Sequence, residues 1–469
     1  MVCFRYGVVL FLGLLSASFL FAEEIEAPAP AQDASPPAQN ASPPNIVFIL
    51  ADDLGYGDLA CYGAPDTKTP HLDKLASEGL RFTQFYGNGA ECTPTRTAIL
   101  TGRYPSRAGG LDCAIGTGNV GRYDDATRLA KTSQLGLPVE QAVIPGIFTK
   151  AGYRSAIFGK WHLGYEPHFN PLKYGWDQFF GVLGGNCDYY THKELSPLPV
   201  LYDGAAPIDR DGYLTHLITE DAVSFIDKQA ASNSPFFLYL PYTAPHFPFQ
   251  APGDTGSVFT AENWSRGPRS AYVSMVEDLD AQVGTILASL ESNGLSGNTL
   301  VIFASDHGAM VPGLNAPLRG HKGGLFEGGI RAPLIAKWPG HLEGGKVNAT
   351  PFLSMDLTAS FARIVGADVA SLNLDGVDMF HHAEVAVPAP ARRLFWRAKR
   401  GTTTWNAVRF GHWKYIYRME GGVPSEWIFN IAEDPEEQVN LLELPQGRNL
   451  RSMCMGALKQ WDADLKPAR

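Results

Sequence analysis

Four short apolar segments, each followed by charged or imidazole side chains, limit the folds open to this chain. They span residues 46–50, 153–158, 235–240 and 299–304. Segments of this length and apolar content are typical of strands that are covered on both faces of a sheet. Helical spacing of apolar residues separates them at 70–79, 212–229 and 271–292. This alternation predicts an α/β domain with a large, doubly wound mixed sheet flanked by helices.

The polar residues that follow these segments in the sequence form a candidate site. The carboxyl ends of parallel strands meet at one edge of a sheet, where ligands bind. Two adjacent carboxylates repel each other unless a cation joins them, so the pair after the first segment indicates a metal site, with a plain polar turn as the alternative. The residues at the four strand ends are Asp52 and Asp53, Lys160 and His162, His246, and Asp306 and His307.

Residues 91–103 place a cysteine at the start of a predicted helix. Pro94 suits the first helical turn, and Gly102 can end the helix. Cys92 would then lie at the positive helix end, with Arg96 one turn away on the same side. This arrangement can hold a nucleophile facing an anion; the alternative is a buried structural cysteine.

The glycine-rich segment 319–333 would present Lys322 into a cleft. It follows no predicted strand and lacks the spacing of a phosphate-binding loop, so it does not indicate nucleotide binding. The net charge of −10 also argues against nucleic acid as a partner. An anionic substrate would therefore need a local positive cluster.

The N-terminus indicates export. Residues 1–22 have the pattern of a signal peptide, with an uncleaved anchor as the alternative, and residues 23–44 form a Pro/Ala/Ser-rich linker. We expect a secreted or periplasmic protein without stable membrane association. Of six cysteines, five lie beyond this segment. The odd number is consistent with a separate task for Cys92, and the other four could form two disulfides whose pairing the sequence does not reveal.

The predicted catalytic domain covers residues 45–370, and residues 371–469 form a smaller α+β subdomain. The subdomain has short aromatic segments that predict an antiparallel sheet, and a closing helix over 449–465. Two stretches of the catalytic domain, 104–142 and 165–211, lack periodicity, as expected of binding loops. The second contains Asn186, Asp188 and Tyr189, which can contact a sugar; the alternative is that they pack within a surface loop.

Taken together and in order, these motifs resemble the type I, formylglycine-dependent sulfatases of the alkaline phosphatase superfamily. The matching stretches are Asp52-Asp53, Cys92-x-Pro-x-Arg96 with Thr101-Gly102-Arg103, 159–164, 244–246, 306–308, Lys322 with the following Glu-Gly-Gly-x-Arg-x-Pro, and 434–441. The 186–192 segment is similar to that of sulfatases acting on N-acetylgalactosamine sulfates. The resemblance implies hydrolysis of a sulfated carbohydrate or aryl sulfate ester.

The same resemblance implies a role for each residue. Asp52, Asp53, Asp306 and His307 would hold a divalent cation, usually calcium, and Cys92 would be oxidised to formylglycine by a maturation enzyme. Arg96, Lys160, His162, His246 and Lys322 would line the sulfate pocket, with His246 or Lys322 protonating the leaving oxygen. Asn186, Asp188 and Tyr189 would contact the sugar.

Two positions depart from the family pattern. Many relatives have serine at the position of Thr95, which bears on recognition by the maturation enzyme. Many have asparagine at the position of His307, and an imidazole there admits magnesium or manganese, or a place outside the metal's ligands. The alternatives to a sulfatase are a phosphodiesterase or phosphonate monoester hydrolase on the same scaffold, and a non-catalytic binder of sulfated glycans with unmodified Cys92.

Overall fold

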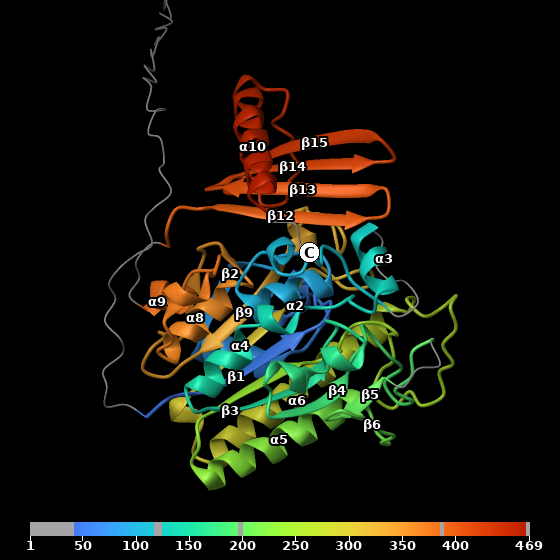
Figure 1. The fold of residues 1–469 in the computed structure, drawn as a ribbon, viewed down its shortest axis with the longest axis vertical. Helices are drawn as coiled ribbons and strands as arrows, with labels where there is room; N and C mark the ends of the chain where they lie inside the picture. The colour runs from blue at the N-terminus through green and yellow to red at the C-terminus, as the bar shows by residue number, and fades with distance from the viewer. Residues whose placement is uncertain (1–41, 117–123, 196–199, 385–388, 466–469) are drawn as a thin grey trace, which may run out of the picture.

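The computed structural model describes residues 42–116, 124–195, 200–384 and 389–465. Within these ranges the chain forms a sheet of eleven strands and a sheet of four. Figure 1 shows the small sheet, in red, above the layered body that holds the large one. The predicted signal peptide and most of the predicted linker lie outside the described residues. No helix in the described ranges has the length and apolarity to cross a membrane.

The large sheet has the strand order β10-β2-β9-β8-β1-β7-β3-β4-β5-β6, with β11 paired to β2. Its centre, from β8 to β4, is parallel. β9 and β5 join the two sides of this centre antiparallel, so the sheet is mixed. The strands are β1 (Asn45–Ala51), β2 (Leu80–Tyr86), β3 (Arg154–Lys160), β4 (Gln178–Val182), β5 (Leu201–Asp203), β6 (Ala206–Pro207), β7 (Phe236–Pro241), β8 (Thr299–Ser305), β9 (Arg331–Lys337), β10 (Lys346–Asn348) and β11 (Phe352–Leu353).

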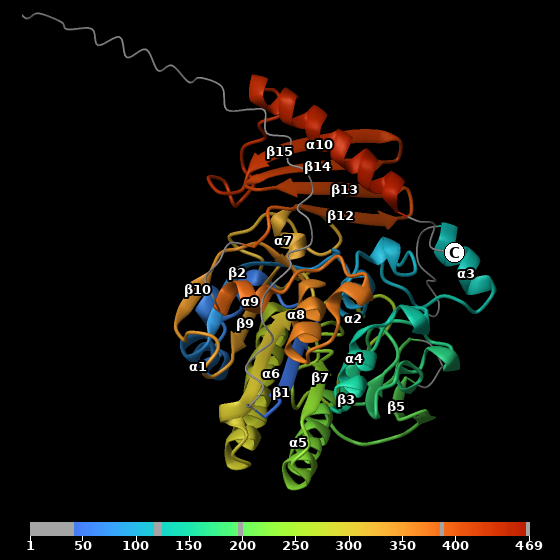
Figure 2. The same ribbon diagram turned by 60° about the vertical axis from the view of Figure 1, so that its left-hand side comes forward.

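Helices cover both faces of this sheet (Figure 2). Successive side chains of a strand point to opposite faces, and β1 shows the consequence: Ile46 and Phe48 belong to one buried core, and Val47 and Ile49 to the other. The first core is closed by α2 (Cys92–Thr101), α3 (Asp124–Lys131), α4 (Ile144–Lys150), α8 (Asp356–Ile364) and α9 (Met379–Glu384); the second by α1 (Pro70–Glu78), α5 (Leu214–Ser232) and α6 (Arg269–Ser292).

The small sheet is an antiparallel meander that contacts the large domain on one face. Trp396, Ala407 and Ile416 pack there against Tyr86 and Met355. Its other face packs against the C-terminal helix α10 (Pro445–Asp464). The strands are β12 (Arg393–Arg400), β13 (Thr403–Phe410), β14 (Trp413–Glu420) and β15 (Val423–Asn430), and the short helix α7 (Glu327–Ile330) lies between the two sheets in Figure 2.

The predicted fold class is confirmed, with differences in detail. The four predicted strands are β1, β3, β7 and β8, which are neighbours in the sheet. The sequence did not predict β2 or β9. The β2–β9 pairing shifts register between Phe82 and Phe85, which disturbs the alternation, and β9 contains Pro333, which is uncommon inside strands.

The two stretches without periodicity are partly regular. The first contains α3, and the second contains β4, β5 and β6. The domain boundary near residue 370 stays a prediction. Beyond it, Met379 and Phe380 of α9 still pack into the core of the large sheet.

Candidate active site

The ends of two adjacent strands bring the predicted metal-binding residues together. β1 and β8 are parallel, with Ala51 opposite Ser305, so the residues that follow them emerge side by side. Asp52 and Asp53 follow β1, and Asp306 follows β8. The backbone N–H of Asp53 donates to Oδ1 of Asp306 at 3.2 Å. This bond ties the two strand ends to each other.

Three buried carboxylates and one imidazole form a donor set suited to a cation. Oxygens of Asp52, Asp53 and Asp306 all lie within 4.8 Å of one another, and each residue is at most 2% exposed. Nε2 of His307 is 3.5 Å from oxygens of Asp53 and Asp306, yet it has no hydrogen-bond partner among the described residues. A buried, unpartnered ring nitrogen beside clustered carboxylates fits a bound divalent cation.

Arg96 and Lys160 pair with two of these carboxylates. Nζ of Lys160 lies 2.5 Å from Oδ2 of Asp52, and Nη2 of Arg96 lies 3.3 Å from both Asp52 Oδ1 and Asp306 Oδ2. Burial disfavours the ionised form of Asp52, but the surrounding positive charges, led by Lys160, together outweigh burial and hold the pKa of Asp52 well below its usual range. Burial raises the pKa of Asp306. The negative charge is therefore distributed unequally over the carboxylates, since the pKa of Asp52 is lowered and that of Asp306 is raised.

Lys322 and His246 lie against Asp53. Nζ of Lys322 is 2.7 and 2.8 Å from the two oxygens of Asp53 and 3.1 Å from Nε2 of His246. Burial disfavours the charge on Lys322, but the neighbouring acidic groups, led by Asp53, together outweigh burial and raise the pKa of Lys322 above its usual value. Burial lowers the pKa of His246 to about 3. The lysine is therefore an ammonium that donates to a neutral imidazole.

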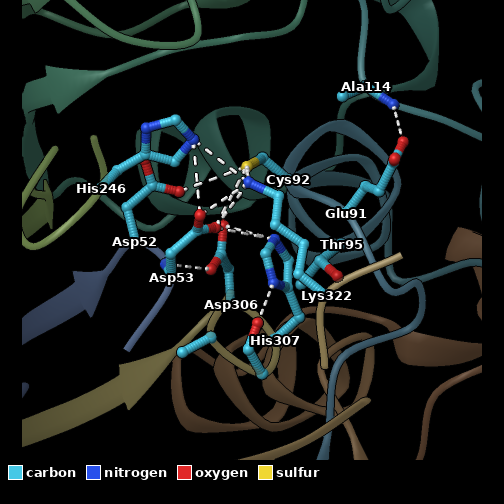
Figure 3. A network of polar contacts seen from close by, with 12 residues as sticks. Asp52, Asp53, Glu91, Cys92, Thr95, Ala114, His246, Asp306, His307 and Lys322 are labelled. Carbon is cyan, nitrogen blue, oxygen red and sulfur yellow. Dashed lines mark hydrogen bonds and ion pairs between the residues drawn. The ribbon is translucent and has the colours of Figure 1, made fainter. Parts of the chain in front are cut away.

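Cys92 is the first residue of α2, and its side chain points at these groups (Figure 3). Its Sγ lies 3.3 Å from Asp52 Oδ1 and 3.7 Å from Lys322 Nζ. Burial, followed by the charge of Asp52, raises the pKa of the Cys92 thiol well above its usual value. The unmodified side chain is therefore a neutral thiol. Thr95 lies one turn along the helix, buried, and its hydroxyl donates to the carbonyl of Gly89 at 3.1 Å.

His162, two residues after the end of β3, is the last of the predicted pocket residues. Its Nε2 lies 2.6 Å from the carbonyl oxygen of Ile115, so this nitrogen carries the proton of the neutral ring. Burial, followed by the charge of Lys160, lowers the pKa of His162 well below its usual value. Nδ1 is the unprotonated nitrogen, and no described residue hydrogen-bonds to it.

A cavity of about 890 Å³ opens above Cys92. Both stretches that lacked periodicity contribute to its wall, as predicted for binding loops: Cys113 to Gly116 come from the first, and Asn186 and Glu194 from the second. The wall also contains residues for which the sequence predicted no role. Trp264 and Arg400 lie far along the chain from every motif, whereas Glu91 and His321 are chain neighbours of Cys92 and Lys322; the others are Met310 and Val311.

The three predicted sugar-contacting residues take different positions. Asn186 lines the cavity, and its Oδ1 accepts from Nε1 of Trp264 at 3.3 Å. Asp188 is 7% exposed and its carboxylate accepts from the backbone N–H of Thr191. The Tyr189 hydroxyl donates to the carbonyl of His246 at 2.9 Å. Asp188 and Tyr189 are therefore turned into the protein and support the loops around the cavity.

The possible pair of disulfides is absent from the described residues. Cys61, Cys92, Cys113, Cys187 and Cys454 are all free thiols. Cys113, Cys187 and Cys454 lie in three different buried cores, which keeps them from pairing. The odd number of cysteines therefore carries no information about Cys92.

Comparison with known proteins identifies the family. The sulfatase family model matches residues 44–367. The chain is 38% identical over 358 residues to N-acetylgalactosamine-6-sulfatase of Mus musculus, covering 71% of this chain and 65% of that protein. It is 33% identical over 449 residues to arylsulfatase A of Bos taurus, covering 85% and 83%. The chain belongs to the sulfatase family, and it spans about 65% of the length of the N-acetylgalactosamine-6-sulfatases that it matches.

Solved structures support the same assignment. The chain resembles the crystal structure of Ps i-CgsB with a TM-score of 0.78 and 29% identity, over 91% of this chain and 94% of that one. The same protein has been solved in complex with k-i-k-neocarrahexaose. The phosphonate monoester hydrolase of Agrobacterium radiobacter shares the fold, with a TM-score of 0.61 at 18% identity, over 90% of this chain and 96% of that one.

Proposed function

We propose that this protein hydrolyses sulfate monoesters of carbohydrates, with residue 92 as the nucleophile after its oxidation to formylglycine. One observation carries the proposal. The Cys92 side chain lies within 3.7 Å of both Asp52 and Lys322, at the floor of a cavity and beside a cluster of metal-type ligands. A sulfate ester needs these three things together: an in-line nucleophile, positive charge around its oxygens, and a proton for its leaving alcohol.

Asp52, Asp53, Asp306 and His307 would hold a divalent cation. Calcium is the first expectation from three carboxylates, and the imidazole admits magnesium or manganese. When bound, the cation would stabilise negative charge on the sulfate and on the attacking oxygen. Without it, three carboxylates and three cationic side chains balance each other, so a divalent cation gives the site the positive charge that attracts a sulfate monoanion.

Once oxidised to an aldehyde and hydrated, residue 92 would offer one hydroxyl that attacks the sulfur and displaces the leaving alcohol. Loss of the proton from the second hydroxyl would then re-form the aldehyde and expel sulfate from the same carbon. A cysteine has no second group of this kind, which is why the proposal includes the modification. Arg96 and Lys160 would keep Asp52 ionised and oriented towards residue 92. Lys322 would bind a sulfate oxygen through Nζ.

Proton transfer would use the three groups that line the cavity. The Lys322 ammonium holds a proton next to His246 Nε2, so this pair can supply one to the leaving alcohol. His162 carries an unprotonated Nδ1, which can accept the proton of the second hydroxyl of residue 92 as the aldehyde is re-formed. These roles rest on the contacts of each nitrogen and on the family resemblance.

The names of similar proteins and the aromatic lining of the cavity favour a sulfated carbohydrate as the substrate. Similar proteins are named N-acetylgalactosamine-6-sulfatase, and Ps i-CgsB has been solved in complex with k-i-k-neocarrahexaose. Trp264, Tyr165 and Phe247 line the cavity, and aromatic faces of this kind pack against sugar rings. A formylglycine-generating enzyme would be the maturation partner, and residues 1–22 would direct export and then be removed.

The test compares an aryl sulfate with the matching aryl phosphate, using protein that was produced together with a maturation enzyme. The proposal predicts clear preference for the sulfate. Preference for the phosphate or a phosphonate ester would assign the site to that chemistry instead. Binding of sulfated saccharides without turnover of any ester would indicate a non-catalytic binder.

A further inference from the structure

We infer that Arg400 forms a second anion-binding subsite in the cavity, which takes a carboxylate or a second sulfate on the same saccharide. This inference rests on the proposed function and extends it to the substrate class: saccharides with a further anionic group near the scissile sulfate. Neither the sequence motifs nor the assigned roles involve Arg400, which belongs to the small sheet.

Arg400 lies close to two segments of the active site. Its Nη1 lies 3.0 Å from Oε1 of Glu91, the chain neighbour of Cys92. The same nitrogen would lie 3.8 Å from a Cβ placed on Gly323, the chain neighbour of Lys322. Arg400 therefore stands next to both segments that carry the proposed reacting groups.

The Arg400 guanidinium also has N–H groups that can bind a ligand in the cavity. Its side chain is 47% exposed, whereas that of Glu91 is 6% exposed, and Arg400 lines the cavity. A guanidinium has five N–H donors in a planar fork. Glu91 is the one ion-pair partner recorded for Arg400 among the described residues. The remaining donors can bind a carboxylate or sulfate in a bidentate manner.

The ion pair with Glu91 still leaves Arg400 able to bind an anion. Its other oxygen, Oε2, accepts from the backbone N–H of Ala114 at 2.7 Å (Figure 3). The carboxylate is thus held on the wall by two partners and serves to orient Arg400. The second acidic side chain of the cavity, Glu194, lies close to Gly184, in a segment remote in sequence from Arg400. Among the described residues Arg400 forms its ion pair with Glu91, so Glu91 is the carboxylate that bears on this subsite.

The test uses three sulfated disaccharides that share the scissile sulfate and differ in one group: a carboxylate, its reduced alcohol, or a second sulfate. We expect kcat/KM for the two doubly anionic substrates to exceed that for the alcohol by about tenfold or more. Arg400→Gln should reduce this ratio towards one. Arg393→Gln removes the same charge from the opposite end of β12 and should leave the ratio unchanged.

Two results would overturn the inference. One is a wild-type ratio near one for both charged substrates. The other is an equal loss on all three substrates in Arg400→Gln, which would make Arg400 a support for the Glu91 segment. Affinities of the same disaccharides, measured by calorimetry on Cys92→Ala, separate this failure from failure of the proposed function. A preference in binding without turnover by the wild type would retain the subsite and reject the sulfatase proposal.

Discussion

Two buried ionic clusters in this protein consist of similar side chains but have different roles, one in the active site and one between the two sheets. The site cluster consists of Asp52, Asp53, Asp306, Arg96, Lys160 and Lys322. The joint cluster lies between the large domain and the small sheet and consists of Glu327, Glu437, Lys414, Arg331 and Arg409. All of these residues except Lys322, which lines the cavity, are buried, and unpaired charges are costly in such surroundings.

The joint cluster pairs its charges across the two parts of the chain. Nζ of Lys414, on β14, lies 2.8 Å from Glu327 and 2.9 Å from Glu437. The backbone N–H of Glu327 donates to Glu437 at 2.6 Å. None of these residues lines the cavity. The cluster therefore connects the small sheet to the short helix α7 and the segment before it, which carries Lys322.

The site cluster differs in three respects that matter for chemistry. It gathers three carboxylates within 4.8 Å of one another and leaves Nε2 of His307 without a hydrogen bond among the described residues. It also meets a cavity through Lys322. Burial and pairing alone do not mark a functional cluster; crowding of like charges, an unpartnered ligand atom and access to a cavity do.

The largest effect is expected from residue 92. Cys92→Ala should lower kcat by at least about 10³-fold, because the nucleophile is lost, while the midpoint of thermal unfolding stays near that of the wild type. Steady-state hydrolysis of an aryl sulfate measures this effect. Cys113→Ala removes another thiol of the same cavity and should retain activity. Near-normal turnover by Cys92→Ala would break the assignment of the site cluster.

Removal of divalent cations should act on the site cluster alone. A chelator is expected to suppress turnover and to lower the unfolding midpoint, because the clustered carboxylates lose the charge that joins them. Restoring activity separately with calcium, magnesium and manganese identifies the preferred ion. Activity that survives exhaustive chelation would show that Asp52, Asp53 and Asp306 work without a metal.

Two lysine variants sharpen the contrast between the clusters. Lys322→Met should reduce kcat/KM by about 10²–10³-fold, because a charge contact in the transition state is lost. Lys414→Met should instead lower the free energy of unfolding by about 3–5 kcal/mol, because Glu327 and Glu437 remain buried without their shared partner. Activity assays and denaturant unfolding on both variants test this. Equal loss of activity at equal folded fraction would remove the distinction.

The smallest effect concerns the pH dependence of the joint cluster. Burial raises the pKa of Glu437 from its usual value of 4.5 to about 7, so the folded state favours the protonated form. The stability that this group contributes is complete below its usual pKa and is lost as the pH rises through about 7. Relative to Glu437→Gln, the wild type should lose on the order of 1–3 kcal/mol of stability between about pH 5 and about pH 8. A difference that stays constant with pH would contradict this.

The sequence predicted the strand ends well and the cavity wall poorly. Asp52, Asp306 and Lys160 follow or end strands of a parallel sheet, so topology alone brings them together. Arg400 and Trp264 reach the cavity through tertiary packing of the small sheet and a long loop, which no local pattern encodes.

The sequence was also uninformative where side-chain direction decides the role. Asn186 and Asp188 lie two residues apart in one loop, yet one lines the cavity and the other bonds to its own loop backbone. The loop turns between them, and alternation rules do not apply outside regular structure. The joint cluster was missed for another reason: its members come from β9, β13, β14, the short helix α7 and the loop that carries Glu437.

Mass spectrometry of the peptide that carries residue 92, from active and inactive preparations of the same protein, tests the central claim most directly. The account predicts that the side chain of residue 92 has changed from –CH₂SH to –CHO, and that specific activity rises in proportion to the converted fraction. Full sulfatase activity in a preparation whose residue 92 is entirely an unmodified thiol would contradict it.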